Sequence, residues 1–293
     1  MKTSHRIETL LARGMLAAMG ALPWRGSLAA GACLGDLTRA LGIRRRVARE
    51  NLARAFPLKS AAEREQILVG HYRELGRVAV EYARLDRLVR AAAGEVVASA
   101  TGIEHLEAAR GRGAILLSGH FSNFEVVGAW LGRLNPLDFV VRPLSNPGVE
   151  AWIAARRRAA GVGLISADDG LRGIFQSLRA GRWVAFLADQ DARAAGVFVP
   201  FFGHPASTPV GPARIALKLG VPILMGFVLR RDDGRFDLEV DPPLPVPDGR
   251  DPDAARTLTA LHTARLEERV RRRPELWFWL HRRWKTAPPA TDE

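Results

Sequence analysis

A histidine and a glutamate five residues apart are the first side chains in this sequence that could carry out chemistry together. They are His120 and Glu125, in the segment SGHFSNFE that follows a predicted buried strand at residues 114–118. Imidazole can take and return a proton near neutral pH, and an ionised carboxylate can orient the ring and stabilise its protonated form. On one continuous helix the two side chains would point about 140° apart, so a turn at residues 121–122 must bring them together. The pattern predicts a strand-to-helix corner with His120 as a base and Glu125 as its partner.

The same glutamate also fits a purely structural role. Ser122 and Glu125 have the spacing of a capping box, in which the two side chains close the first turn of a helix. The helix dipole keeps a glutamate ionised at that position, so the structural and catalytic roles are compatible. The spacing alone leaves both interpretations open.

Composition narrows the class of protein. The chain has 293 residues, is 47% apolar, and carries 43 Lys and Arg against 31 Asp and Glu, a net charge of +12. Nearly all the cations are arginines, whose planar fork suits phosphate groups, although an arginine-rich genome would give the same bias. The single Cys33 excludes an internal disulfide framework. Because the cations are spread along the chain without a binding-module signature, we expect no nucleic-acid partner.

Alternating apolar runs and amphipathic segments predict an α/β fold, with a central, mostly parallel sheet flanked by helices and a helical N-terminal segment. The predicted strands are residues 114–118, 139–142, 183–189, 221–229 and 236–240. The predicted helices are residues 124–134, 147–160, 169–180, 211–219 and 252–273. We expect three regions: an amphipathic, membrane-associating segment at residues 1–45, a main α/β domain at residues 46–286 that carries the candidate catalytic residues, and a disordered tail at residues 287–293.

The N-terminal segment lacks the roughly 18 uninterrupted apolar residues of a membrane-spanning helix. It does have an apolar stripe at helical spacing, formed by Ile7, Leu10, Leu11, Met15, Leu16, Met19 and Leu22. This stripe predicts a helix that lies in a membrane interface or packs on the domain. A cleavable signal peptide is not expected, because no compact apolar region precedes a small-residue cleavage site.

Five further segments accompany SGHFSNFE in a fixed order. They are NLARAFP at residues 51–57, DFVVRP at 138–143, LADQD at 187–191, GVFVPFFGHPAST at 196–208 and WFWLHRRWK at 277–285. Together these segments resemble the lipid A biosynthesis (lauroyl/myristoyl) acyltransferase family, within the lysophospholipid and glycerolipid acyltransferases. The resemblance covers roughly residues 45–286. It implies a glycerolipid acyltransferase-like fold and an enzyme on the cytoplasmic face of the bacterial inner membrane.

The resemblance also implies an activity and several site residues. The implied reaction takes an acyl chain from acyl carrier protein, or from coenzyme A, and places it on a phosphorylated glucosamine disaccharide lipid; other acceptors, such as a lysophospholipid, a mannoside or an ornithine lipid, stay open. Catalysis falls on His120 and Glu125, and Arg142 resembles a substrate-binding arginine. A further arginine in the next helix is one of three adjacent candidates, Arg156, Arg157 and Arg158.

In the expected mechanism His120 removes the proton from the acceptor hydroxyl as that oxygen attacks the thioester carbonyl. Backbone N–H groups near residues 122–124, or Arg142, are the candidate donors to the resulting oxyanion. The reaction needs no metal and no cofactor besides the thioester. Asp189 and Asp191 could bind a metal, but no third ligand accompanies them, so orienting the substrate or holding the next loop is the expected role.

Other segments have two open interpretations each. Residues 197–203 are apolar and aromatic, which fits either the wall of an acyl groove or ordinary core. Residues 277–284 mix tryptophans with cations, which fits either a membrane interface or the end of a core helix or strand. His204 is expected to be a surface histidine. The remaining candidate substrate-contacting residues are Asp189, Gln190, Phe201, Phe202, Gly203 and Thr208.

Overall fold

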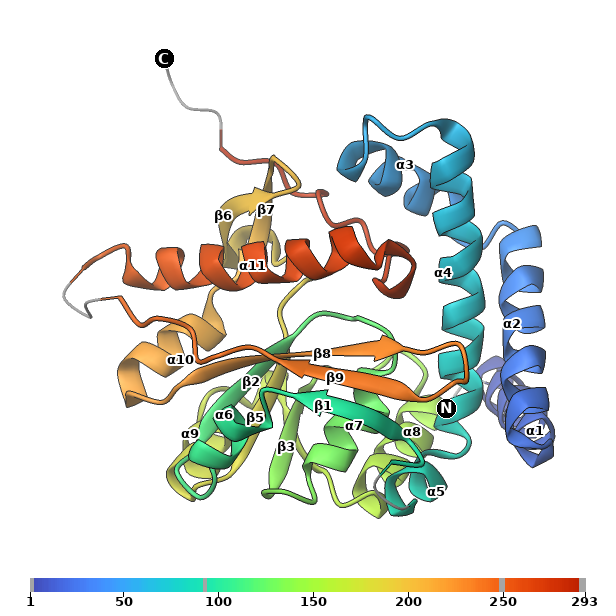
Figure 1. Cartoon of the computed structure of the whole chain (residues 1–293), viewed down its shortest axis with the longest axis horizontal. Helices are drawn as coiled ribbons and strands as arrows, with labels where there is room; N and C mark the ends of the chain where they lie inside the picture. The colour runs from blue at the N-terminus through green and yellow to red at the C-terminus, as the bar shows by residue number, and fades with distance from the viewer. Residues whose placement is uncertain (1–2, 92–93, 248–250, 290–293) are drawn as a thin grey trace.

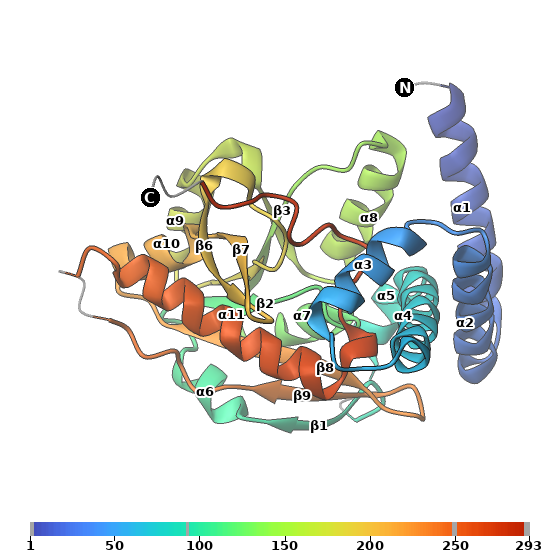
Figure 2. The same ribbon diagram turned by 90° about the horizontal axis from the view of Figure 1, so that it is seen from above.

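A central sheet is covered by helices, and the helices at the N-terminus lie to one side of it (Figures 1 and 2). The computed structural model describes residues 3–91, 94–247 and 251–289. The helices in these ranges are α1 (Thr3–Ala21), α2 (Trp24–Ala40), α3 (Arg45–Ala55), α4 (Ala61–Tyr82), α5 (Leu85–Arg90), α6 (Ile103–Ala108), α7 (Phe124–Leu131), α8 (Pro147–Ala159), α9 (Arg172–Arg179), α10 (Gly211–Leu219) and α11 (Ala254–Arg272). The strands are β1 (Val97–Thr101), β2 (Ala114–Ser118), β3 (Leu137–Val141), β4 (Gly163–Ser166), β5 (Trp183–Leu187), β6 (Gly196–Phe201), β7 (His204–Pro209), β8 (Ile223–Arg230) and β9 (Phe236–Val240).

Within the described ranges, seven strands form one sheet in the order β1-β9-β8-β2-β5-β3-β4. All neighbouring strands are parallel except β8 and β9, which are antiparallel. The predicted α/β fold with a mostly parallel sheet is therefore confirmed. The segment expected to be an acyl-groove wall or core forms a separate antiparallel hairpin, β6–β7. Its turn residues Phe202 and Gly203 have φ angles of 52° and 75°, as a two-residue type I′ turn requires.

Both faces of the sheet are buried at β2 and β8, which explains why these two strands are continuous apolar runs in the sequence. On β2, Ile115 and Leu117 join one core cluster with residues of α9, α10 and α11. Ala114 and Leu116 point the other way, into a second cluster with residues of α5, α6 and α7. This alternation fixes which side chains of β2 face each layer of helices.

The N-terminal helices pack beside α4, away from the sheet (Figure 1). The backbones of α2 and α4 touch, since a Cβ atom at Gly35 would lie 2.0 Å from the carbonyl oxygen of Tyr72. Leu10, Leu11 and Met15 of α1 are 68%, 69% and 44% exposed, so much of the predicted apolar stripe faces solvent. The side chain of Ile7, and residues 290–293 of the predicted tail, lie outside the described part. No helix within the described ranges has the length and apolar character to span a bilayer.

Candidate active site

The carboxyl ends of β2 and β5 meet at one edge of the sheet and bring two polar side chains together. The strands are parallel neighbours, with Ser118 opposite Leu187 at their ends. His120 follows β2 by two residues, and Asp189 follows β5 by two residues. Ligand sites of parallel sheets form at this edge, because loops diverge there. The topology therefore places an imidazole beside a carboxylate although the two are 69 residues apart in sequence.

Asp189 holds His120 at two points. Its Oδ1 lies 2.7 Å from Nδ1 of the ring, and its Oδ2 accepts a 2.7 Å hydrogen bond from the His120 backbone N–H. The indole N–H of Trp277 donates to the same Oδ2 at 2.8 Å. The Asp189 side chain is 2% exposed and the His120 side chain is 28% exposed. One ring nitrogen is thus fixed by a buried carboxylate, while the ring as a whole stays partly open to solvent.

The electrostatics of the pair favour a protonated imidazole next to an ionised carboxylate. Burial alone would lower the pKa of His120, but the charge and hydrogen bond of Asp189, with a smaller contribution from the charge of Glu125, raise that pKa above its ordinary value. Burial would raise the pKa of Asp189, but His120 and Trp277 together lower it to about 2. Asp189 is therefore charged at neutral pH and can stabilise the imidazolium that forms when His120 takes a proton.

The carboxylate that touches His120 is therefore Asp189, and the predicted direct contact between His120 and Glu125 is not the one observed. Glu125 instead forms a two-point ion pair with Arg157, in which Arg157 Nε donates to Glu125 Oε2 at 2.9 Å and Nη2 donates to Oε1. Burial, together with the charge of Glu125, raises the pKa of the Tyr82 hydroxyl well above its ordinary value, which places this phenol beside the pair. Of the three adjacent arginines, Arg157 is the one at the site, whereas Arg158 is exposed.

The capping-box interpretation of Ser122 and Glu125 also needs correction. The N-cap of α7 is Asn123, whose side chain accepts from the backbone N–H of Val126 at 3.1 Å. The Ser122 hydroxyl donates instead to Glu74 of α4 at 2.7 Å. Ser122 has a positive φ of 46°, a conformation that is uncommon for a residue with a side chain. This tight backbone turn separates the His120 loop from the helix that carries Glu125.

A buried ionic network supports the turn from behind. Arg230, at the end of β8, donates to both carboxylate oxygens of Glu74, at 2.6 and 2.9 Å, and to both of Glu81, at 2.6 and 2.8 Å. Glu81 in turn accepts a 2.6 Å hydrogen bond from the side chain of Asn123. The network thus accepts hydrogen bonds from Ser122 and Asn123, two of the three residues between His120 and the start of α7.

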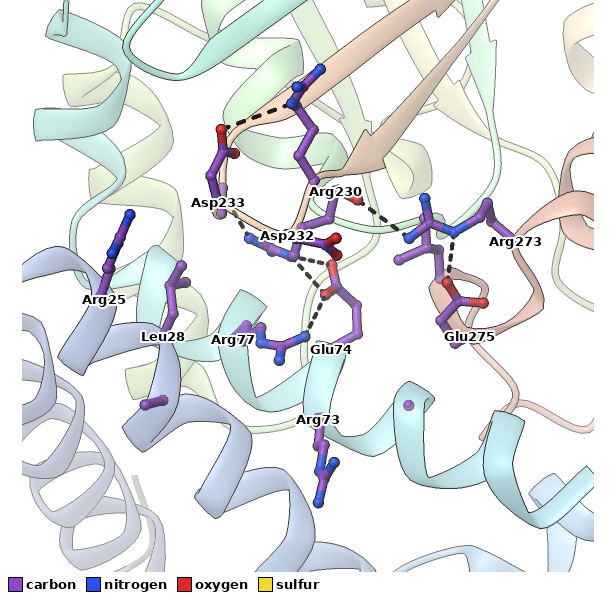
Figure 3. A pocket seen from close by; sticks show the side chains of 15 residues that line it. Arg25, Leu28, Arg73, Glu74, Arg77, Arg230, Asp232, Asp233, Arg273 and Glu275 are labelled. Atoms are coloured by element: carbon purple, nitrogen blue, oxygen red, sulfur yellow. Dashed lines mark hydrogen bonds and ion pairs between the residues drawn. The ribbon is translucent and has the colours of Figure 1, made fainter. Parts of the chain in front are cut away.

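The other side of the network faces a cavity of about 840 Å³ between α2, α4 and the β8–β9 turn (Figure 3). Its lining includes Glu74 and Arg230 together with the more exposed cations Arg25, Arg77 and Arg273. Figure 3 shows Arg77 directed at Glu74, and Arg273 paired with Glu275. Six arginines and four carboxylates line this cavity, so its charge is mixed rather than uniformly basic.

The loop that carries His120 is fixed by the segment after α11. Phe121 forms a β-bridge with Trp277, the Ser122 N–H donates to the Leu276 carbonyl, and the Phe278 N–H donates to the His120 carbonyl. Trp277 and Trp279 are 1% and 0% exposed, so the core interpretation of this segment is supported over the membrane-interface one. Asn51 of α3 holds the same segment by donating to the carbonyl oxygens of Trp279 and His281.

The remaining predicted site residues divide into two groups. Gln190 lies at the site, with its Nε2 atom 3.4 Å from Nε2 of His120. Arg142 follows β3, two strands from β2, and is exposed. Phe201 and Phe202 are 0% and 5% exposed and pack on each other and on the tryptophans after α11, so they belong to the core rather than to an open groove.

The hairpin residues at the end of this segment have structural partners. Thr208 is buried, and its hydroxyl accepts from Arg283 Nη2 at 2.5 Å. Gly203 occupies the exposed β6–β7 turn, next to the exposed His204. Neither Thr208 nor Gly203 contacts His120 or Asp189. Asp191 accepts from the Thr286 hydroxyl, and its own N–H donates to His281 Nε2 at 3.0 Å, so it holds the loop after β5.

Sequence reasoning missed Asp189 as the partner of His120, and it missed Tyr82, Glu74, Glu81 and Arg230 entirely. The sequence did contain a signal for Asp189, because this residue follows a predicted buried strand, as His120 does. Only the order of the strands in the sheet shows that these two strands are neighbours and that the two residues meet. For Glu74 and Glu81, the available signal was a pair of carboxylates seven residues apart, two helical turns, among the apolar positions of α4.

Comparison with known proteins identifies the family of this chain. A family model described as bacterial lipid A biosynthesis acyltransferase matches residues 2–286. The lipid A biosynthesis palmitoleoyltransferase of Escherichia coli is 30% identical over 88% of this chain and 84% of its own length, and the lauroyltransferase of the same organism is 29% identical over 96% and 92%. A phosphatidylinositol mannoside acyltransferase of Mycobacterium tuberculosis is 29% identical over 80% of this chain and 76% of its own. The chain belongs to the bacterial lipid A biosynthesis acyltransferase family and is an O-acyltransferase.

Proposed function

We propose that this enzyme transfers a fatty acyl group from the thioester of acyl carrier protein to a hydroxyl of a phosphorylated glucosamine disaccharide lipid. The observation that carries the proposal is the partly exposed imidazole of His120, which the buried Asp189 fixes at Nδ1. The chain belongs to a family of lipid A acyltransferases, which gives this imidazole its context. Because Asp189 accepts the Nδ1 proton, Nε2 keeps its lone pair and can act as the base.

In the proposed reaction, Nε2 of His120 takes the proton of the acceptor hydroxyl while that oxygen bonds to the thioester carbon. The carbonyl π electrons move onto oxygen and form a tetrahedral oxyanion. When the carbonyl re-forms, the C–S bond breaks, and the leaving thiolate receives the proton back from His120. Asp189 stays ionised throughout, stabilises the imidazolium and holds the ring in the required tautomer. The thioester is itself a substrate, so we propose no separate cofactor.

The Glu125–Arg157 pair and Arg142 have different roles in this proposal. Glu125 is 1% exposed and bound at two points by Arg157, so its carboxylate shapes the site and adds negative potential near His120. Arg142 is exposed, and no ion pair or hydrogen bond engages its side chain in the described structure. It follows β3, and two interstrand spacings place the end of that strand about 10 Å from the end of β2. That separation suits a phosphate group some distance from the reacting hydroxyl.

The exposed apolar stripe of α1 supports membrane attachment. Leu10, Leu11 and Met15 face solvent, and Arg6 and Arg13 flank them as exposed cations. An amphipathic helix with this arrangement lies in a lipid interface with its cations near anionic headgroups. We propose that the enzyme works on the cytoplasmic face of the bacterial inner membrane, where its lipid acceptor and the carrier protein meet.

A second acceptor class is favoured by one specific observation. Among the relatives, the phosphatidylinositol mannoside acyltransferase is nearly as similar to this chain as the lipid A enzymes are. A mannoside hydroxyl could be deprotonated by the same His120, since the base acts on the hydroxyl and not on the rest of the sugar. The acceptor assay therefore includes both sugars.

The test uses purified protein with dodecanoyl thioesters of acyl carrier protein and of coenzyme A, each with a tetraacylated glucosamine disaccharide phosphate or a phosphatidylinositol mannoside. We expect acyl transfer to the disaccharide, and a rate at least about 100-fold lower for His120→Ala. His105→Ala is the matched control, because His105 lies on α6, outside the site. Acyl transfer by His120→Ala at the control rate would refute the proposed base.

A further inference from the structure

The oxyanion formed in the proposed reaction needs a hydrogen-bond donor, and one side chain already touches the catalytic nitrogen. The carboxamide Nε2 of Gln190 lies 3.4 Å from Nε2 of His120. In the neutral ring that acts as a base, Asp189 accepts the proton on Nδ1, so Nε2 is an acceptor and the Gln190 N–H group is the donor toward it. The acceptor hydroxyl must bind at this nitrogen, so the carboxamide lies within a few ångströms of the atoms that react.

The backbone on both sides of Gln190 is held firmly. The Asp189 carboxylate accepts from the His120 N–H and from the Trp277 indole, and the backbone N–H of Ala188 donates to the Ser118 carbonyl. On the other side, the Asp191 N–H donates to His281. Gln190 itself is only half-buried. A fixed backbone with a partly open carboxamide is what a pre-positioned donor requires, because little reorganisation is then needed during the reaction.

Several other candidate donors are already engaged or too distant. The Ser122 N–H donates to the Leu276 carbonyl at 2.7 Å, and the Val126 N–H donates to the Asn123 side chain. Arg157 is committed to Glu125 at two points. Arg142 follows a strand that is the second neighbour of β2, about 10 Å away by strand spacing. Gln190, by contrast, follows β5, which is directly paired with β2.

We propose that the Gln190 carboxamide N–H stabilises the tetrahedral oxyanion. This inference rests on the proposed function, because it assumes acyl transfer with His120 as base. The incoming hydroxyl takes the place of the carboxamide on His120 Nε2, and the freed N–H turns to the carbonyl oxygen as negative charge develops there. Gln190 gives and takes no proton: the hydroxyl proton goes to His120 and then to the leaving thiolate. A neutral amide thus offers a hydrogen bond that strengthens only as the charge forms.

The experiment measures kcat and KM for acyl transfer by the full-length protein with Gln190→Ala, Gln190→Glu and His120→Ala. Gln176→Ala is the matched control, since Gln176 is an exposed glutamine on α9. We expect Gln190→Ala to lower kcat by about 10²- to 10³-fold, the loss typical of an oxyanion donor, with KM for both substrates within threefold. Gln190→Glu should be slower still above pH 7, because its carboxylate repels the oxyanion. Circular dichroism and thermal unfolding check that each variant is folded.

Each outcome has a distinct meaning. A kcat of Gln190→Ala within threefold of the wild type, with His120→Ala inactive, would overturn the oxyanion role and leave the proposed function standing. A rise in KM at unchanged kcat would also overturn it, because the residue would then bind the ground state and the transition state equally. Wild-type activity in His120→Ala would remove the proposed function and this inference with it. A loss in kcat shared by Gln190→Ala and Gln190→Glu, at unchanged KM, supports the oxyanion role.

Discussion

Asp189 contacts His120 through both of its carboxylate oxygens, one on the ring at Nδ1 and one on the backbone N–H, each at 2.7 Å. A ring and a main chain bound by one carboxylate cannot rotate or shift independently. The Trp277 indole donates to the same carboxylate and so fixes the carboxylate itself. The orientation of the base therefore depends on a residue that follows the third strand after it in sequence but lies beside it in space.

The first prediction concerns Asp189→Asn. The amide retains the shape of the side chain but loses the charge that stabilises the imidazolium, so we expect kcat to fall by roughly 10²- to 10⁴-fold. The pH dependence should change as well. Asp189 raises the pKa of His120, and a base must be neutral, so wild-type kcat/KM should fall as pH drops through a value above 6.5. In Asp189→Asn burial dominates, and the midpoint of this fall should move to a lower pH. An unchanged midpoint would contradict the assigned pairing.

The second prediction separates stability from catalysis at Glu125. Glu125 and Arg157 are 1% and 14% exposed, so Glu125→Ala leaves a guanidinium in a poorly solvated place without its partner. We expect the free energy of unfolding to fall by about 3–5 kcal/mol, as is typical when one member of a buried pair is removed. Glu50→Ala is the control, because Glu50 and its ion-pair partner Arg46 on α3 are 57% and 83% exposed, and its effect should stay within about 0.5 kcal/mol. Urea unfolding followed by tryptophan fluorescence measures both.

His120→Ala should behave differently in the same unfolding experiment. It removes a side chain that is 28% exposed, so it should cost far less stability than Glu125→Ala while it abolishes turnover. Equal losses of stability in the two variants would contradict the expectation that His120 contributes little to the fold.

The third prediction concerns phosphate recognition by Arg142. A guanidinium binds a phosphate at two points and an ammonium at one, so Arg142→Ala should raise KM for the phosphorylated acceptor by about 10- to 100-fold and Arg142→Lys by much less. With a dephosphorylated acceptor both substitutions should have little effect. Steady-state kinetics on the matched pair of acceptors gives the answer, and identical behaviour on both acceptors would rule out a phosphate contact at this arginine.

The fourth prediction concerns the ionic network behind the catalytic loop. Arg230→Met leaves Glu74 and Glu81 buried at 3% and 0% exposure without their shared cation, and we expect a loss of at least about 3 kcal/mol in unfolding free energy. The two carboxyls would then hold protons more tightly when folded than when unfolded, so the stability of this variant should rise as pH falls toward 5. Arg231→Met, at a neighbouring but exposed arginine, is the control. Denaturant midpoints at pH 5 and 8 distinguish the two variants.

The fold was largely predictable because its main signals are local. The apolar run at residues 114–118 and the alternating run at 236–240 match β2 and β9 to the residue, and the amphipathic pattern at 211–219 matches α10. The β6–β7 hairpin was not predicted as strands, since its sequence contains three prolines, Pro200, Pro205 and Pro209, and proline is unfavourable in a sheet interior. A two-stranded ribbon has open edges on both sides, where a missing N–H is tolerated.

The site was predictable in its parts but not in its pairing. The spacing of His120 and Glu125 suggested a contact, because a sequence pattern constrains the distance only between residues that are close together in the chain. The positive φ at Ser122 and the N-cap at Asn123 direct Glu125 toward α8 and Arg157 instead. The partner of His120 comes from β5, whose place beside β2 follows from the strand order and not from distance along the chain.

The last prediction tests membrane attachment through α1. Leu10 and Leu11 are 68% and 69% exposed, and burying each leucine in lipid would contribute about 1.5–3 kcal/mol. Replacing both with glutamate removes that contribution and adds two charges that anionic lipid repels, so binding to vesicles that contain phosphatidylglycerol should fall by more than tenfold in a sedimentation assay. Leu171→Glu is the control, since Leu171 is 52% exposed outside α1 and should retain binding. The helix α1 packs on α2, α4 and α8, away from the strands β2 and β5 that lead into the site (Figure 1), so the turnover of detergent-solubilised substrate should be unchanged. Equal vesicle binding by the α1 variant and the control would place the membrane contact elsewhere on the protein.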